Sequence, residues 1–284
     1  MQGEVLCRPA LPSDREAVME FLPLIREGED YVSGVWDEWL LDQGGVLAAA
    51  VMGGRAVGLS HLVDLGGGEW WLEGLRVDPR LQGRHIGSHL HEYQVKEWLS
   101  TQGDVVRLVT RGQRRAVHRM CARTGFDKTA SLSELAFEPT DGGHGFQPAG
   151  AEEADRAVPR FLSSPAHAAS GGLMDLGWRF ARIESERITS AARERRLWQW
   201  RDGDGLLVAR FGQGPEAGAL TLSTVALPEG DPPAFLDDVR RLAGSLGARS
   251  GRWLADPLRE AQVLAHPGYR LESSDPLWIF ERRR

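Results

Sequence analysis

The stretch Trp71–Leu90 reads WLEGLRVDPRLQGRHIGSHL and is the most informative segment of this chain about its fold. A run typical of a strand ends at Val77-Asp78-Pro79, and Gln82–Ser88 then leads directly into a run with apolar residues at helical spacing. A short strand–loop–helix connection gathers backbone N–H groups at the positive end of the helix dipole, which suits a pyrophosphate. The segment therefore predicts a phosphate-binding loop inside an α/β domain.

Strands and helices alternate on both sides of this segment. A hairpin turns at Gly53-Gly54, and the later elements are each separated by short polar connections. We predict strands at 4–8, 46–52, 56–63, 70–77, 105–110 and 132–137, and helices at 14–25, 36–41, 86–100 and 115–123, with Ser13 as the N-cap of the first helix. A hairpin followed by strands that alternate with helices indicates an α/β domain built on a mixed sheet flanked by helices.

The second half of the sequence repeats features of the first half. Arg8-Pro9-Ala10 corresponds to Gln147-Pro148-Ala149, and further apolar pairs follow in the same order at a nearly constant offset. A segment rich in Pro, Gly and Asp, Glu138–Gly145, separates the halves. We therefore predict two tandem copies of one fold, a first domain at 1–140 and a second at 146–284, arranged as a pseudo-dimer in a monomer or weak dimer.

Composition excludes several classes of function. The net charge of −6, from 34 basic and 40 acidic residues, argues against a nucleic-acid partner. Of the local basic runs, we expect the terminal Arg282–Arg284 to be a solvated tail. No run reaches the roughly 18 apolar residues of a membrane span, so no membrane partner is expected. Two distant cysteines and the lack of an apolar leader favour a cytoplasmic location.

The loop resembles the signature of the GNAT superfamily of N-acyltransferases, Q/R-x-x-G-x-G/A between the fourth strand and the third helix. Gln82 and Gly87 match it, but His85 stands where the first signature glycine is found. The resemblance implies two tandem GNAT-like domains and acetyl-coenzyme A (acetyl-CoA) as co-substrate. The strand before the loop would hold the pantetheine arm and the loop the pyrophosphate, which gives as cofactor-binding residues Leu75, Arg76, Val77, Gln82, Gly83, Arg84, His85, Ile86, Gly87 and Ser88.

A second segment, Arg114–Phe126, resembles the family's N-x-x-A-x-x-x-Y-x-x-x-G-F pattern. With Gly125-Phe126 in register, Arg114 stands at the Asn position and Cys121 at the Tyr position. That Tyr commonly protonates the departing coenzyme A (CoA) thiolate, so Cys121 is the candidate at the leaving-group end and the usual general acid is missing. We assign Arg114, with Arg111 and Arg115 near it, to the adenosine 3′-phosphate, the alternative being a solvated helix start.

Glu73 is the predicted general base. It precedes the loop on its strand, where many family members place a carboxylate near the incoming amine. An attacking amine must lose a proton, which a carboxylate accepts directly or through water. The alternative is that Glu73 only hydrogen-bonds to neighbouring backbone or to Arg76.

The prediction of the binding site for the acceptor amine rests on a shorter resemblance. Asp30-Tyr31, Trp39-Leu40 and the run E-G-L-R-V at 73–77 are similar to segments of the vertebrate histidine N-acetyltransferase and its bacterial relatives. This similarity implies that Asp30 pairs with a cationic amine and that Tyr31 stacks on it. The alternative is a helix-terminal Asp and a half-buried Tyr.

Two further patterns are interpreted as carrying no ligand. His85, His89 and His91 lie close together, but no carboxylate or third ligand completes a known pattern, so no metal is expected. In the second copy, the loop at 228–233 reads PEGDPP. Prolines lack N–H donors and the two carboxylates repel a pyrophosphate, so this copy is predicted to be degenerate.

The sequence thus predicts an acetyl-CoA-dependent N-acetyltransferase with one site per chain. The acceptor is a primary amine of a small molecule, an amino acid or similar, which attacks the thioester directly in a ternary complex. Two alternatives stay open: a non-catalytic acyl-CoA sensor module, favoured by His85 and the missing Tyr, and a peptide or protein N-acetyltransferase.

Overall fold

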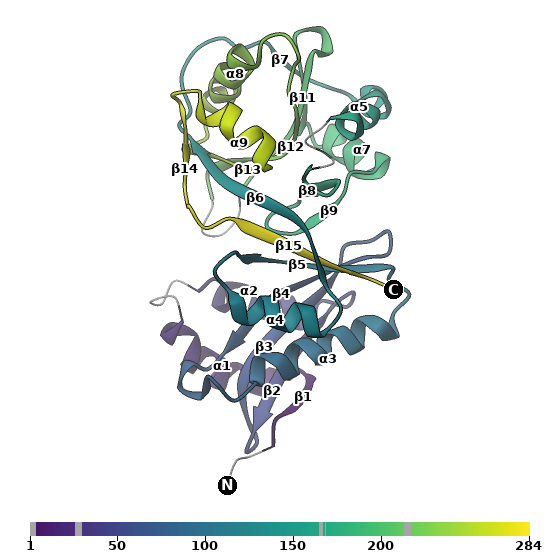
Figure 1. Cartoon of the computed structure of the whole chain (residues 1–284), viewed down its shortest axis with the longest axis vertical. Helices are drawn as coiled ribbons and strands as arrows, with labels where there is room; N and C mark the ends of the chain where they lie inside the picture. Colours follow the sequence, from purple (N-terminus) through teal and green to yellow (C-terminus); the bar gives the residue numbers. More distant parts are fainter. Residues whose placement is uncertain (1–3, 26–29, 165–166, 168, 213–216) are drawn as a thin grey trace. The chain divides into compact units, whose positions relative to one another are not determined.

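The computed structural model describes the chain except for residues 1–3, 26–29, 165–166, 168 and 213–216 (Figure 1). It forms two compact units. The first unit comprises Met1–Leu108, Arg114–Asp127 and Phe280–Arg284, and the second comprises Val109–Gln113 and Lys128–Ile279. The last five residues of the chain therefore belong to the first unit.

The first unit is built on a twisted mixed sheet. Its strands are β1 (Leu6–Pro9), β2 (Val46–Met52), β3 (Arg55–Asp64), β4 (Glu69–Val77), β5 (Val105–Arg111) and the end of β15 (Leu277–Arg283), and they are neighbours in this order. β1 to β4 pair antiparallel, whereas β4 and β5 pair parallel through the crossover helix α3 (Ile86–Ser100). The mixed α/β fold predicted from the sequence is confirmed.

Helices cover both faces of this sheet because its strands alternate apolar side chains. On one face, Leu47 and Leu59 pack against α1 (Arg15–Phe21) and α2 (Val32–Leu41). On the other face, Ala48 and Ala50 pack against Ile86 and Leu90 of α3, which crosses the sheet in Figure 1. The small side chains of β2 let α3 lie close to the sheet. The helix α4 (Arg115–Arg123) and the strand β6 (Asp127–Phe137) follow β5 along the chain.

The first predicted helix differs from expectation. Instead of one helix over 14–25, α1 is flanked by two 3-10 turns, Pro12–Asp14 and Leu22–Leu24. The second turn contains Pro23, which has no N–H to continue the α-helical ladder. Ser13 is not the N-cap: the carboxylate of Asp14 accepts the N–H of Leu11 at 2.8 Å and pairs with Arg8 at 2.7 Å.

The tail prediction for Arg282–Arg284 is also wrong. Arg282 and Arg283 lie in β15, and the guanidinium of Arg282 donates to the carbonyl of Thr124 at 2.7 Å. The neighbouring Glu281 bonds to the buried guanidinium of Arg107 at 2.5 Å. The end of the chain is thus a structural part of the first unit.

The second unit has a similar order of elements, with a small hairpin added between its first two helices. After β7 (Phe146–Pro148) and α5 (Ala151–Ser163) come a small hairpin, β8 (Leu173–Asp175) and β9 (Phe180–Arg182), and the helix α7 (Ser185–Arg193). The chain then continues with β10 (Leu197–Trp200), β11 (Gly205–Phe211), β12 (Ala219–Ala226), α8 (Pro232–Ser245), β13 (Ser250–Ala255), α9 (Pro257–Leu264), β14 (Tyr269–Leu271) and β15. β12 and β13 pair parallel through α8, as β4 and β5 do through α3.

Alternate side chains of β11 point to opposite faces of the second unit's sheet. Leu206 and Val208 pack with α5 and α7, whereas Leu207 and Ala209 pack with α8. Over the residues that the structure describes, no helix is both long and apolar enough to cross a membrane.

Candidate active site

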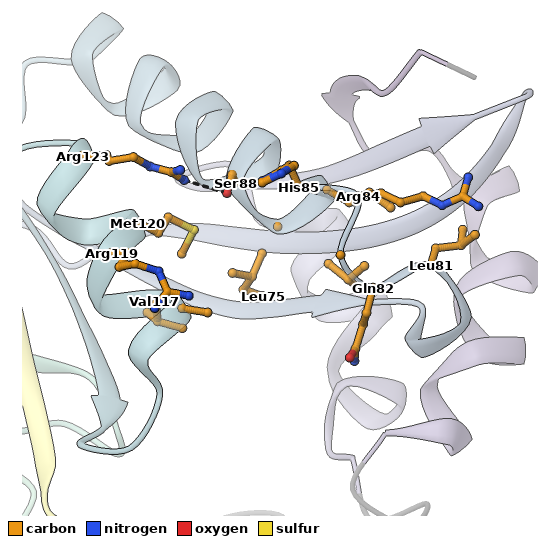
Figure 2. Close-up of a pocket in the computed structure, with 15 residues that line it drawn as sticks. Leu75, Leu81, Gln82, Arg84, His85, Ser88, Val117, Arg119, Met120 and Arg123 are labelled. Atoms are coloured by element: carbon orange, nitrogen blue, oxygen red, sulfur yellow. Dashed lines mark hydrogen bonds between the residues drawn. The ribbon is translucent and has the colours of Figure 1, made fainter. Parts of the chain in front are cut away.

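A pocket of about 370 Å³ opens at the start of α3 in the first unit. The strand β4, the loop after it, the first turn of α3 and one side of α4 form its walls (Figure 2). The lining residues are Leu75, Val77, Leu81, Gln82, Gly83, Arg84, His85, Ile86, Gly87, Ser88, Ala116, Val117, Arg119, Met120 and Arg123. Of the predicted cofactor-binding residues, all but Arg76 and Arg114 line this pocket.

The loop has polar contacts of its own. Asp78 follows β4 and accepts the backbone N–H of Arg80 at 3.0 Å and its guanidinium at 2.8 Å. The hydrogen bonds from Arg80 lower the pKa of the Asp78 carboxyl, so the bridge is charged at neutral pH. The chain then makes a 3-10 turn, Pro79–Leu81, and enters α3.

His85 has the backbone conformation of a glycine. It precedes the first residue of α3 with φ 59° and ψ 13°, in the left-handed region that glycine adopts freely and histidine rarely. His85 therefore adopts a backbone conformation that is open to glycine, the residue found at this position in the signature that the loop resembles. Gly87 follows on the pocket wall, where a Cβ would meet Leu75 and Val77 only at ordinary distances of 3.8 and 3.7 Å. The absence of a side chain at Gly87 keeps this part of the pocket wall open.

Two arginines of α4 face the loop. Arg119 and Arg123 line the pocket, and the guanidinium of Arg123 donates to the Ser88 hydroxyl at 2.9 Å (Figure 2). Their spacing of four residues places both on one side of the helix, a signal that was present in the sequence. Arg114 is the N-cap residue of α4 and lies outside the pocket lining. In the second unit, Arg111 is paired with Glu134 at 2.5 Å, an ion pair that the sequence did not reveal.

A bulge at Gly74 changes which residues of β4 point to each face of the sheet. His61 of β3 pairs with Glu73 and Leu59 pairs with Arg76, so β4 has one residue more than β3 between these pairs. Gly74 takes φ +64°, and a Cβ there would lie 2.5 Å from the ring of Trp39. The extra residue shifts the alternation, so that Glu73 and Arg76 share the face covered by α2.

Leu75 and Val77 consequently point toward the pocket, whereas the side chain of Arg76 points away from it. Pairing between β4 and β5 covers only Glu69–Trp71 of β4. Among the described residues, this ladder ends at Trp71, and a strand edge beyond a ladder can offer N–H and C=O groups to an extended ligand.

Glu73 lies beside a buried histidine. Its carboxylate is 3.3 Å from Nδ1 of His61, and the Glu73 side chain is 13% exposed. On the other side of the ring, the Asp42 carboxylate is 3.3 Å from Nε2. The ring of Trp39 stacks on His61 with 4.7 Å between centroids. Sequence reasoning missed His61 and Asp42, since neither belongs to a recognisable motif.

Asp30 and Tyr31 are already engaged within the protein. The Asp30 carboxylate accepts from Nε of Arg76 at 2.6 Å and from the N–H of Val32 at 3.0 Å. The Arg76 guanidinium lies over the Tyr31 ring, 5.5 Å from its centroid. This arrangement matches the alternative interpretation, a helix-terminal Asp and a half-buried Tyr.

Cys121 is packed in the core. Its side chain has no exposed surface, and it is not among the pocket-lining residues. Burial raises the pKa of the thiol to about 12. A thiol is ordinarily an acid with a pKa of about 8.5, so a group held this far above it is poorly suited to protonate a coenzyme A thiolate.

The equivalent loop of the second unit offers fewer N–H donors at the start of its helix. The carboxylate of Asp231 caps α8 by accepting the N–H of Ala234 at 3.2 Å. Pro232 and Pro233, which have no N–H groups, occupy the first two positions of the helix. Among the residues that the structure describes, no group of three or more His, Cys, Asp or Glu side chains is arranged to hold a metal ion.

Comparison with known proteins agrees with this geometry. Residues 15–126 match the model of the acetyltransferase (GNAT) family. No curated protein matches the sequence significantly. Similar solved structures include a GCN5-related N-acetyltransferase from Sphaerobacter thermophilus (14% identity, 98% of this chain and 95% of the other, TM-score 0.65). Another, from Kribbella flavida, shares 16% identity over 99% of this chain and 72% of the other, with a TM-score of 0.54.

A tandem GNAT protein from the clavulanic acid biosynthesis pathway is similar along its whole length. It shares 14% identity over 99% of this chain and 98% of its own, with a TM-score of 0.60. At such identities the likeness concerns the fold, and the similarity to histidine N-acetyltransferases stays a prediction. Residues 15–126 thus match the acetyltransferase (GNAT) family model, and the chain along its whole length has the fold of solved GNAT proteins, a tandem one among them.

Proposed function

We propose that the first unit transfers an acetyl group from acetyl-CoA to the primary amine of a small molecule. One observation carries this proposal. The bulge at Gly74 directs Leu75 and Val77 into the pocket at the start of α3, and directs the carboxylate of Glu73 to the opposite face of the same strand. A thioester bound along β4 and an amine beside Glu73 would therefore meet across one strand.

The pocket fits the polar end of coenzyme A. The N-terminus of α3 carries the positive end of a helix dipole, and the loop before it follows the left-handed path at His85 that a backbone anion site needs. Arg119 and Arg123 add two guanidinium groups, which suit phosphates. Gln82–Ser88 would hold the pyrophosphate, and the backbone of Leu75 and Val77 the pantetheine arm.

The acetyl thioester supplies the carbonyl that the acceptor attacks. Glu73 takes the proton that the amine must lose, since its carboxylate keeps a small exposed surface and lies beside a polar partner, His61. Cys121 does not act as the acid, because it is buried with a raised pKa. We infer that water returns a proton to the departing thiolate.

The second unit serves as a structural partner without a coenzyme A site of its own. Its helix α8 begins with two prolines and is capped by Asp231, whose carboxylate stands where an anion would bind. We assign the domains at 1–140 and 146–284 to an active and a degenerate copy, with the C-terminal residues 280–284 completing the fold of the first.

The test is a panel of amines with acetyl-CoA, followed by the release of coenzyme A. The panel contains amino acids, aminoglycosides and short peptides, and each is run with the full chain and with Glu73→Gln. We expect turnover of at least one small amine and loss of about two orders of magnitude in the variant. Unchanged turnover by Glu73→Gln would refute its role. Binding of acetyl-CoA without turnover of any amine would point to a sensor, and turnover of peptides alone to a protein acetyltransferase.

A further inference from the structure

A small cavity of about 40 Å³ lies within the second unit, where the strands β12 and β13 separate (Figure 1). Among the described residues, the parallel ladder between these strands ends at Leu222 and Trp253. The residues that follow on the two strands, 223–225 and 254–256, line the cavity together with Arg259 of α9. All of them belong to the second unit, so this cavity is separate from the pocket at the start of α3.

Arg259 brings a buried positive charge to this cavity. The residue is 8% exposed, and its guanidinium donates to the carbonyl of Val225 at 2.8 Å and to the hydroxyl of Ser164 at 2.5 Å, which are both neutral groups. The carboxylate of Asp256 is 4.0 Å from Nε, too far for a hydrogen bond. Burial lowers the pKa of Arg259, and the charge of Asp256 offsets this only in part. Because buried charges are normally paired at hydrogen-bond distance, this site favours an anion.

Ser223 supplies a second polar group to the wall of the cavity. The residue is 6% exposed, and its hydroxyl oxygen has no hydrogen-bond partner in the part of the chain that the structure describes. Proteins rarely keep a buried polar group without a partner unless water or a ligand satisfies it. A serine hydroxyl can donate one hydrogen bond, so Ser223 can serve an acceptor atom inside the cavity.

The other ionisable groups of the wall leave this role to Arg259. Asp256 is the N-cap of α9, and its carboxylate accepts the N–H of Leu258 at 2.9 Å, so it is engaged with the start of the helix. Burial raises the pKa of the Asp256 carboxyl and lowers the pKa of His167, whose ring is therefore neutral at pH 7. Apolar side chains, Phe161 among them, complete the wall.

We propose that this cavity binds a small carboxylate of one or two carbons, such as formate or acetate. The volume of about 40 Å³ admits about three water-sized groups, since one water needs about 10–15 Å³. A carboxylate matches the planar fork of the Arg259 guanidinium and accepts the hydrogen bond that Ser223 can donate. The second unit, which lacks a pyrophosphate loop, is then a binding module for a small acid. This inference goes beyond the proposed function, because it involves neither acetyl-CoA nor an amine.

Saturation-transfer NMR of sodium acetate with the full chain at pH 7 tests the proposal. We expect saturable binding to the wild-type chain, abolished by Arg259→Gln and weakened about tenfold by Ser223→Ala, which removes one hydrogen bond to a charged group. Ser223→Ala deletes a hydroxyl that has no partner among the described residues, so this variant should fold even if Arg259→Gln does not. Arg156→Gln is the matched control, because Arg156 is exposed on α5 of the same unit and lies outside the cavity wall. It should bind acetate as the wild type does.

Two competitors define the class of ligand. Acetamide has the shape of acetate without its charge, and chloride has the charge without two oxygens in a plane, so neither should displace acetate at equal concentration. Displacement by either one would overturn the assignment to a carboxylate. A wild-type chain that shows no saturable binding of acetate, or equal binding by the wild type and Ser223→Ala, would overturn the site itself. The measurement contains no acetyl-CoA, so its outcome is independent of whether the first unit turns over an amine.

Discussion

Replacing Gly74 by alanine should damage both the stability and the activity of the first unit. The residue has φ +64°, which costs an L-residue about 1–2 kcal/mol. Its new Cβ would lie 2.5 Å from the ring of Trp39, which is buried and cannot move away freely. Overpacking of this kind costs about 1–3 kcal/mol. The free energy of unfolding should therefore fall by about 2–5 kcal/mol in total.

Gly53→Ala is the matched control. Gly53 has a similar φ of +57°, but nothing lies within 4 Å of the position that a Cβ would take, so only the backbone strain of about 1–2 kcal/mol applies. Urea denaturation of both variants measures the difference, which should be about 1–3 kcal/mol. Gly74→Ala should also lose turnover, since relief of the clash moves Glu73, whereas Gly53→Ala should keep it. Equal destabilisation by the two variants, or full activity in Gly74→Ala, would refute the argument from the bulge.

Three further predictions concern the surroundings of the pocket. Burial, aided by the charges of nearby arginines, lowers the pKa of His91 from 6.5 to about 4. The folded state therefore favours the neutral ring. Its contribution to the free energy of unfolding is present above pH 6.5 and is lost as the pH falls toward 4. His91→Gln should remove an acid sensitivity of about 3 kcal/mol, seen as a smaller difference between urea midpoints at pH 7 and pH 4.5. Arg123→Ala should weaken acetyl-CoA binding about tenfold by calorimetry, whereas Arg115→Ala, on the same helix but outside the pocket lining, should not. His85→Gly should relieve left-handed strain, raising the free energy of unfolding by about 1 kcal/mol without weakening acetyl-CoA binding; weaker binding would show that the His85 side chain itself contacts the ligand.

Local patterns predicted the helices around the pocket well. The helices at 86–100 and 115–123 have the predicted bounds, because apolar spacing and short polar connections are properties of neighbouring residues. The loop Gln82–Ser88 lines a pocket at the start of α3 for the same reason. His85, which stands in place of the signature glycine, has the left-handed backbone conformation that glycine adopts freely.

Contacts between distant segments were not predictable in this way. His61, Asp42 and Trp39 meet through the packing of α2 on β3, and no spacing rule connects them to Glu73. The bulge at Gly74 shifts the alternation of β4 by one residue, so simple counting places Arg76 on the wrong face. The return of the last residues to the first unit depends on pairing between strands far apart in the sequence, which composition does not encode.

Titration of the full chain with acetyl-CoA by calorimetry counts the cofactor sites on which the proposed function depends. We expect one binding site per chain, abolished by Gly87→Leu, which fills the pocket at the start of α3, and unaffected by Pro232→Ala in the second unit. Two sites per chain, or binding that persists in Gly87→Leu, would contradict the proposed function.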